Sequence, residues 1–360
     1  MIDLRKVAVI GAGVMGRGIA AHVANAGVPV LLLDVVPLGA TDRNALAEAA
    51  LAALRSAQPA AFMHPRNARL VTPGNIEDHL ASLADVDWII EAAVEDLAVK
   101  RSIYSRLEQF RRPESIVSSN TSTIPLRQLI DGLPPAFAQR FLITHFFNPP
   151  RYMRLLEIVV GEQTCPEVVG TLSSFADLGL GKGVVPCKDR PGFIANRIGG
   201  FWLQCALTEA FAKGLDVEEA DAALGPPVGI PKTGVFGLLD LVGLDLVAQV
   251  RRSLVANLPS DDAFQAIRDV PSLVMRMIET GRIGRKGKGG FYRRVEQADR
   301  SAIEAIDLQS DEYRPLRRPS KDSGPKLGLR TFLEQPDRAN RYAWRVLSET
   351  LRYAAEIVFD

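Results

Sequence analysis

The chain has 360 residues, 47% of them hydrophobic and 24% charged, which is enough to bury a sizeable core in two or three domains. Lys and Arg number 43 against 42 Asp and Glu, so no bulk charge attracts nucleic acid or an anionic membrane, and we expect a small-molecule partner. The three cysteines lack the spacing of a zinc site and the number of a secreted disulfide scaffold, which indicates a reducing compartment and no metal site.

Hydropathy also bears on location. No apolar run approaches the ~20 residues that a membrane-spanning helix needs, so we expect no membrane span. Residues 1–6 lead directly into a predicted strand and leave no room for a signal or transit peptide. The sequence therefore favours a cytoplasmic protein.

From Lys6 to about Val185, short apolar runs alternate with amphipathic stretches, a pattern typical of a parallel sheet with crossover helices. The predicted strands are Val7–Ile10, Val30–Leu33, Trp88–Ala92, Ile116–Ser118 and Leu142–Phe146, with extended pieces near Leu156–Val160 and Val184–Pro186. We therefore expect an α/β fold in which residues 1–186 form a Rossmann-type, doubly wound dinucleotide-binding domain.

Beyond Pro191 the strand pattern ends and helical periodicity begins. The predicted helices are Phe193–Lys213, Val217–Leu224, Leu238–Leu254 and Ser272–Thr280. They indicate a second, all-helical domain over residues 187–293. Residues 294–325 are rich in charge and proline and are predicted to be a linker. Residues 326–360 are helical again, but they are too few to form a core, so they must dock on the rest or belong to something longer.

A glycine-rich turn follows the first predicted strand, with the sequence Gly11-Ala12-Gly13-Val14-Met15-Gly16. In such a turn the first glycine turns the chain, the second lets the backbone approach a pyrophosphate, and the third lets the helix pack on the strand. The helix that begins here offers unpaired N–H groups and a positive dipole end to the phosphates. Strand, glycines and helix together predict a dinucleotide site rather than a bare turn.

Asp34 ends the second predicted strand, where a carboxylate should accept hydrogen bonds from the ribose hydroxyls. A 2′-phosphate would be repelled by this carboxylate, and no arginine follows at once to offset the repulsion. We therefore expect NAD rather than NADP as the cofactor.

His145 lies at the carboxyl end of the fifth predicted strand, where ligands meet open α/β sheets. A turn at Pro149-Pro150 would bring Glu157 back to the imidazole, hydrogen-bond one ring N–H and leave the other nitrogen free as a base. Such a pair suits the oxidation of a secondary alcohol. A histidine beside phenylalanines is more often a packed core residue, but the hydroxyls and amide of residues 118–123 follow another strand and should lie at the same sheet edge.

Several motifs resemble those of the 3-hydroxyacyl-coenzyme A dehydrogenases of fatty-acid oxidation, in that family's order and over about residues 5–293. They are Asn120-Thr121-Ser122, His145-Phe146-Phe147-Asn148-Pro149, Pro191-Gly192-Phe193-Ile194-Ala195-Asn196-Arg197 and Gly287-Lys288-Gly289-Gly290-Phe291-Tyr292. The resemblance implies NAD-dependent oxidation of an L-3-hydroxyacyl-CoA to a 3-oxoacyl-CoA, with the second domain as that family's helical C-terminal domain.

The resemblance also implies a role for each matching residue. His145 would be the general base and Glu157 would orient it and stabilise its charged form. Ser122 and Asn196 would hydrogen-bond the substrate hydroxyl or thioester carbonyl, and Asn148 belongs to the same substrate site. The residues implied near the cofactor are Ser122, Glu95 and Lys100, which match positions by the nicotinamide ribose, and Lys286, which returns toward the cofactor from the helical domain. Glu95 and Lys100 read equally well as a solvated charge pair.

The resemblance extends to assembly. Stand-alone relatives dimerise through the helical domain, so a homodimer is expected, while Leu327–Asp360 resembles the opening of a second helical repeat in a longer multifunctional enzyme. Two other functions stay open. A dehydrogenase of free hydroxy acids or sugar acids would keep the glycines and the His145–Glu157 pair, and a non-catalytic NAD-binding protein would keep the fold without the chemistry.

Overall fold

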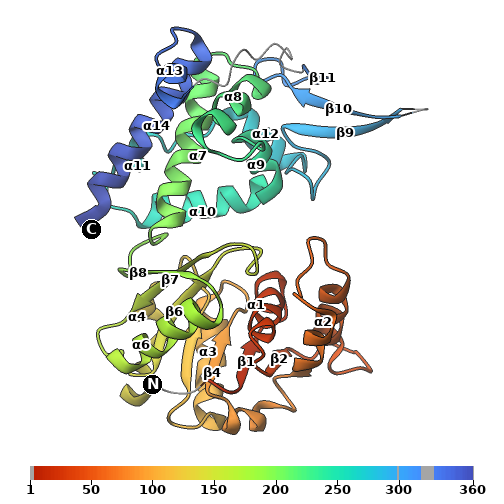
Figure 1. The fold of residues 1–360 in the computed structure, drawn as a ribbon, viewed down its shortest axis with the longest axis vertical. Helices are drawn as coiled ribbons and strands as arrows, with labels where there is room; N and C mark the ends of the chain where they lie inside the picture. The colour runs from red at the N-terminus through yellow and green to blue at the C-terminus, as the bar shows by residue number, and fades with distance from the viewer. Residues whose placement is uncertain (1–3, 298–299, 318–327, 360) are drawn as a thin grey trace. The chain divides into compact units, whose positions relative to one another are not determined.

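The computed structural model describes residues 4–297, 300–317 and 328–359. The chain forms two compact units, Met1–Phe193 and Ile194–Asp360, drawn in red to yellow-green and in green to blue in Figure 1. The boundary falls a few residues after the predicted one because strand β8 (Gly183–Cys187) and the buried Phe193 still pack with the first unit.

An eight-stranded sheet forms the centre of the first unit, in the order β3-β2-β1-β4-β5-β6-β7-β8. Its other strands are β1 (Val7–Ile10), β2 (Val30–Asp34), β3 (Val71–Asn75), β4 (Trp88–Glu91), β5 (Ile116–Ser119), β6 (Phe141–Phe146) and β7 (Leu155–Val160). Strands β1 to β6 are mutually parallel, β7 is antiparallel to β6, and β8 is parallel to β7. The predicted doubly wound α/β architecture is therefore confirmed.

Helices cover both faces of this sheet (Figure 1). They are α1 (Val14–Asn25), α2 (Ala45–Ser56), α3 (Leu97–Phe110), α4 (Leu126–Ile130), α5 (Pro135–Ala138) and α6 (Pro166–Ser174). Alternate strand residues point to opposite faces, so Val7 and Val9 pack with α1, α2 and α6, whereas Ala8 and Ile10 pack in a second core with α3 and α4. This double burial explains why the strands are almost continuously apolar.

One strand of this sheet was not predicted. Edge strand β3 contains Pro73 and Gly74, two residues that normally argue against a strand interior. Pro73 is tolerated here because β3 pairs on one side only, with β2.

The second unit is built mainly of helices around one core. They are α7 (Ala195–Ala212), α8 (Val217–Ala223), α9 (Phe236–Val242), α10 (Leu244–Asn257), α11 (Ala263–Ala266) and α12 (Ser272–Glu279). The predicted single helix Leu238–Leu254 is wrong, because Gly243 has a φ of +99° and separates α9 from α10. The helical prediction for residues 187–293 otherwise holds, apart from the end of β8, a bridge between Gly284 and Gly289, and the first residues of β9.

The predicted linker is wrong over its described part. Strands β9 (Tyr292–Gln297), β10 (Arg300–Ile306) and β11 (Tyr313–Pro315) form an antiparallel sheet. The buried side chains of Ala305 and Ile306 join the helical core, so the segment is part of the unit despite its charge. Residues 318–325 of the predicted linker lie outside the described residues.

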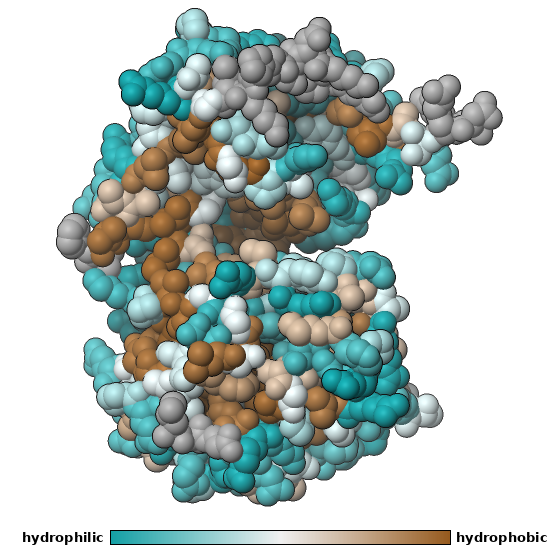
Figure 2. All heavy atoms as spheres, in the orientation of Figure 1, coloured by the Kyte–Doolittle hydropathy of each residue, from teal (hydrophilic) through white to brown (hydrophobic). Residues whose placement is uncertain are grey.

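The C-terminal segment docks on the same core. Helix α13 (Leu329–Leu333) is followed by α14 (Arg338–Glu356), which packs against α7, and the rings of Tyr353 and Phe201 stack at 4.1 Å. Figure 2 shows apolar atoms at the surface near the C-terminal end of α14. Leu351 of α14 and Val358 of the following turn η5 (Ile357–Phe359) are exposed. Across both units, no described helix combines the length and apolarity that crossing a bilayer requires.

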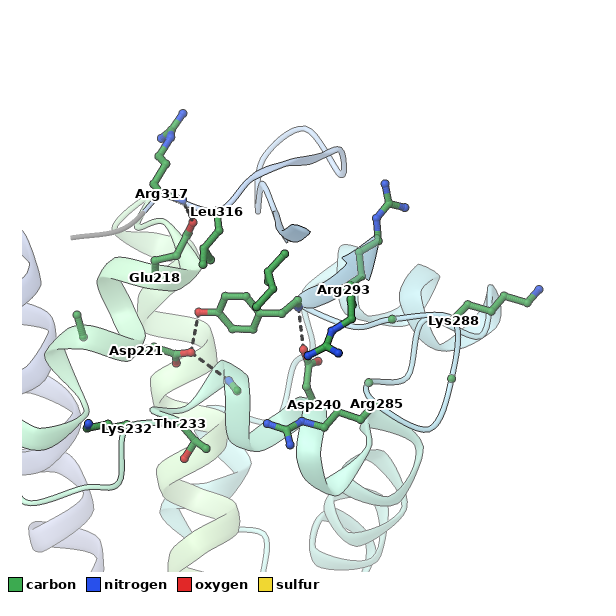
Figure 3. A pocket seen from close by; sticks show the side chains of 18 of the residues that line it. Glu218, Asp221, Lys232, Thr233, Asp240, Arg285, Lys288, Arg293, Leu316 and Arg317 are labelled. Atoms are coloured by element: carbon green, nitrogen blue, oxygen red, sulfur yellow. Dashed lines mark hydrogen bonds between the residues drawn. The ribbon is translucent and has the colours of Figure 1, made fainter. Parts of the chain in front are cut away.

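An open pocket of about 1190 Å³ lies between the helices and the sheet of the second unit (Figure 3). The hydroxyl of Tyr292 donates to the Asp221 carboxylate at 2.8 Å, and the backbone N–H groups of Phe236 and Gly237 donate to it at 2.6 and 3.0 Å. Burial nevertheless raises the pKa of Asp221 to about 7, and it raises the pKa of Asp240 in the same pocket to about 6.

The raised pKa of Asp221 predicts a pH dependence of stability. The folded state holds this proton more tightly than the unfolded chain, so Asp221 increasingly disfavours the fold as pH rises from about 4 to about 7. We expect the free energy of unfolding of the wild type, relative to Asp221→Asn, to fall by up to about 4 kcal/mol across this range. Urea unfolding of both proteins at several pH values measures the difference, and a difference that does not change with pH contradicts the prediction.

Candidate active site

The glycine-rich turn between β1 and α1 has the geometry that a pyrophosphate needs. Gly11 has a φ of +102°, and a Cβ at Gly16 would lie 1.8 Å from the Gly11 carbonyl oxygen, so both positions require glycine. A Cβ at Gly13, in contrast, would meet nothing within 4 Å. No side chain of the described residues caps α1. The turn therefore fits a bound dinucleotide phosphate.

Asp34 lies against this turn at the end of β2. Its carboxylate accepts from the backbone N–H of Ala12 at 2.6 Å and from that of Val35 at 2.7 Å. The nearest following arginine, Arg43, donates to Asp78 at 2.7 Å, and this contact lowers the pKa of Asp78 to about 2. The charge of Arg43 is thus already matched, which agrees with the expected preference for NAD. The contact between Asp34 and the ribose stays a prediction.

Replacing Asp34 should change cofactor choice. Asp34→Ala is expected to weaken NAD binding and to lower the ratio of kcat/KM for NAD over NADP by about fivefold or more, because a repulsion worth at least about 1 kcal/mol is lost. Asp34→Asn keeps an acceptor for the turn N–H groups without the charge, so it separates repulsion from turn geometry. An unchanged ratio in both variants would remove Asp34 from the discrimination.

The predicted acid and base meet directly. Residues His145 of β6 and Glu157 of β7 are opposite each other in the antiparallel ladder, so both side chains leave the same face of the sheet. Nδ1 of His145 lies 2.7 Å from Oε2 of Glu157, and both residues are buried. The rings of Phe147 and Phe193 contact the imidazole edge to face, at 4.5 and 5.7 Å between centroids. The pair is therefore enclosed and held in one orientation.

Polar residues after β5 adjoin this pair. The side-chain oxygen of Asn120 accepts from the N–H of Phe146 at 2.9 Å and ties the end of β5 to the residue after His145. Half-buried Ser122 donates its N–H to Glu95 at 3.3 Å, and the Thr123 hydroxyl donates to the same carboxylate at 2.7 Å. Glu95 thus fixes the backbone that carries Ser122.

A buried network missed by the sequence analysis lies under this loop. Glu91, at the end of β4, accepts from Lys100 at 2.7 Å and from the hydroxyls of Tyr104 and Ser119, each at 2.6 Å. Burial and the neighbouring Glu91 carboxylate raise the pKa of Tyr104 well above its ordinary value. The spacing of Lys100 and Tyr104, one helical turn apart on α3, was the available signal.

The alternative interpretation of Glu95 and Lys100 as a solvated charge pair is wrong, because the lysine is buried. Lys100 is 1% exposed, and its ammonium lies 2.7 Å from Glu91 and 3.4 Å from Glu95. Burial raises the pKa of Glu95, but the charge of Lys100 and the nearby hydroxyl donors outweigh burial and lower it overall. Glu95 is therefore an ionised anchor at this sheet edge, and the contacts of both residues with the nicotinamide ribose stay predictions.

Three predicted residues are not brought to the His145–Glu157 pair by the contacts described. Asn148 is exposed in the turn after β6. Asn196 is half-buried in the first turn of α7, in the second unit. Lys286, also in the second unit, is exposed and pairs with Asp245 at 2.9 Å. Their contacts with substrate or cofactor stay predictions.

Fold and site together define a protein of the Rossmann type, with the glycine-rich turn and the buried acid–histidine pair that are typical of dinucleotide-dependent oxidoreductases. Comparison with known proteins makes this specific, because residues 6–190 match the NAD binding domain of 3-hydroxyacyl-CoA dehydrogenase and residues 192–294 match its C-terminal domain. The chain belongs to the 3-hydroxyacyl-CoA dehydrogenase family.

Individual proteins that the chain resembles support the same family assignment. The chain is 39% identical over 374 residues to a probable 3-hydroxyacyl-CoA dehydrogenase of Bacillus subtilis, covering 99% of this chain and 47% of that protein. It is 40% identical over 316 residues to a Rickettsia felis protein whose name describes a fatty acid oxidation complex trifunctional enzyme, covering 88% of this chain and 44% of that protein. The crystal structure of M. tuberculosis FadB2 matches with a TM-score of 0.68 and 32% identity, over 82% of this chain and all of that one. The chain thus spans about half the length of the two curated relatives.

Proposed function

We propose that this chain oxidises the 3-hydroxyl group of an L-3-hydroxyacyl-CoA to a 3-oxo group with NAD⁺. The observation that carries the proposal is the buried contact of 2.7 Å between His145 and Glu157 at the carboxyl edge of the parallel strands. A general base beside a bound dinucleotide must lie at this edge of the sheet, must be oriented by a partner and must be shielded from bulk water, and His145 meets these three requirements.

The geometry supports a definite protonation pattern at the base. An ionised Glu157 accepts the Nδ1–H of His145, which leaves Nε2 as the acceptor for the substrate hydroxyl proton. As that proton arrives, the carboxylate stabilises the imidazolium that forms. The glycine-rich turn at residues 11–16 would hold NAD⁺, which would supply the acceptor for the hydride of C3. Ser122 and Asn196 would hold the substrate oxygen in place while the proton leaves.

Activity with graded substrates tests the proposal. NADH formation is followed at 340 nm with L-3-hydroxyacyl-CoA thioesters of increasing chain length and with free 3-hydroxybutyrate. We expect turnover of thioesters and little or none of the free acid. Preference for the free acid would favour the alternative of a hydroxy-acid dehydrogenase, and no oxidation of any of these substrates, despite NADH binding, would favour a non-catalytic NAD-binding protein.

The tail and the relatives support a proposal about the whole protein. Helix α14 docks on the helical core beyond the matched family domains, and two of the curated relatives, those of Bacillus subtilis and Rickettsia felis, are about twice as long as this chain. We propose that this chain is the N-terminal dehydrogenase part of a longer multifunctional enzyme. Mass measurement of the native product tests it, because a native product of 360 residues would contradict it.

Taken alone, the chain is proposed to form a homodimer, which light scattering after size-exclusion chromatography would check.

A further inference from the structure

A buried lysine lies beneath the turn that joins the two halves of the His145–Glu157 pair. Lys182 is between the π-helical turn η3 (Phe175–Gly179) and β8 and is 2% exposed. Its ammonium donates to the carbonyl oxygen of Met153 at 2.8 Å and to that of Pro150. It also lies 5.6 Å from the ring centroid of Phe146, the residue after His145. One side chain thus contacts both the end of β6 and the turn leading to β7.

No carboxylate of the described residues pairs with this lysine, so its charge is compensated only by carbonyl dipoles and an aromatic ring. The titratable group that interacts with it is His22 of α1, which is not an acid, and the charge of Arg151 acts on the same histidine. Burial lowers the pKa of Lys182 to about 8, and burial, followed by the charge of Lys182, lowers the pKa of His22 to about 4. A buried amine in such surroundings costs free energy, which is a reason to look for a function.

The other side-chain tethers of this turn are more exposed. Arg151 donates to the carbonyl oxygens of Ala60 and Phe62 at 2.6 and 2.9 Å, and the Tyr152 hydroxyl donates to Ala60 at 2.9 Å. Tyr152 is 46% exposed and Arg151 is half-buried, so these bonds compete with water. Lys182 is the tether that water reaches least.

We propose that Lys182 is a positioning residue that holds the turn between β6 and β7, and thereby the alignment of the His145 imidazole with Glu157. The proposal rests on the proposed function, since the pair matters for turnover only if His145 is the base. Without the ammonium, the carbonyls of Pro150 and Met153 lose a buried donor, and the turn relaxes toward other bonds. A displacement of about 1 Å at a catalytic group can cost roughly 10²-fold in rate.

Lys182→Met tests this, because methionine keeps the stem over Phe146 and removes the donor. We expect kcat to fall roughly 10- to 100-fold while the dissociation constant for NADH stays within about twofold. The chain has four histidines, so the ¹⁵N resonances of the rings are resolvable, and His145→Gln assigns the one of interest. In Lys182→Met the His145 resonances should shift, His22 should shift because it loses a nearby charge, and His64 and His79 should not.

Lys232→Met is the matched control, since it removes one positive charge from an exposed lysine of the second unit, and it should keep wild-type kcat and His145 resonances. Thermal unfolding verifies that each variant is folded, and Lys182→Leu, which also removes the donor, replaces Lys182→Met if that variant does not fold. A fall in kcat together with shifted His145 resonances supports the proposal, and either change alone, or neither, overturns it. If the wild type turns over no hydroxyacyl-CoA, the proposed function fails, and the His145 resonances alone then decide whether Lys182 holds the pair.

Discussion

His145→Gln is expected to lower kcat roughly 10²–10⁴-fold, the range typical of a lost general base, while NADH binding stays nearly unchanged. Glutamine approximates the size of imidazole and can still donate to Glu157, so the buried carboxylate keeps a partner. What it lacks is a nitrogen that can take up a proton at neutral pH. Steady-state kinetics with a hydroxyacyl-CoA thioester and fluorescence titration of NADH measure the two effects, and turnover close to that of the wild type would refute His145 as the base.

Glu157 provides the internal control for this prediction. Glu157→Gln removes the charge that stabilises the imidazolium but leaves the base in place, so we expect a smaller fall in kcat than in His145→Gln. Because Glu157 acts through His145, the double variant should be no slower than His145→Gln alone. Additive effects of the two substitutions would show that Glu157 acts by another route.

Gly13→Ala is expected to weaken NADH binding roughly 10- to 100-fold without destabilising the fold. Gly13 has φ −62° and ψ −171°, which alanine also adopts, and its Cβ would meet no atom of the protein within 4 Å. The added methyl group would instead occupy the space through which the pyrophosphate approaches the N–H groups of α1. Losing one or more charge-assisted hydrogen bonds, worth about 1.5–3 kcal/mol each, accounts for the effect.

Gly16→Ala is the contrasting variant in the same turn. Its Cβ would lie 1.8 Å from the Gly11 carbonyl oxygen, so the turn itself must move at a cost of about 1–3 kcal/mol or more. Thermal unfolding without cofactor and NADH titration distinguish the two variants. Gly13→Ala should lose affinity alone, and Gly16→Ala should lose stability as well. Unchanged NADH affinity in Gly13→Ala would contradict a pyrophosphate at this turn.

Local patterns in the sequence were sufficient for most of the first unit. Strands buried on both faces are apolar throughout, so β1, β2 and β4 to β7 stand out from the amphipathic helices, and edge strand β8 was found from the short apolar run at Val184 and Val185. Strand β3 was missed because it lies at the edge and contains Pro73 and Gly74. Strands β9 to β11 were missed for a different reason. Their exposed positions carry many charges, and only tertiary packing, as at Ala305, reveals them as part of the core.

The candidate site also contains some residues that the sequence predicts and others that it does not. His145, Glu157 and the glycine-rich turn were predicted because strand ends and turn residues fix where they lie. The acceptors and donors around them depend on contacts between distant segments, such as Glu91 with Tyr104 and Lys182 with Pro150. Sequence spacing indicates at most that Lys100 and Tyr104 share one face of α3. Their partners on other segments become visible only in three dimensions.

The register in which β6 pairs with β7 decides whether the acid and the base of the proposed active pair lie on the same face of the sheet. His145 and Glu157 occupy directly opposed ladder positions, and side chains along a strand alternate between faces. Shifting one strand by a single residue would therefore send acid and base to opposite sides of the sheet. A one-residue slip of this ladder would therefore separate acid and base completely instead of loosening their contact, so the register of the two strands and the pair stand or fall together.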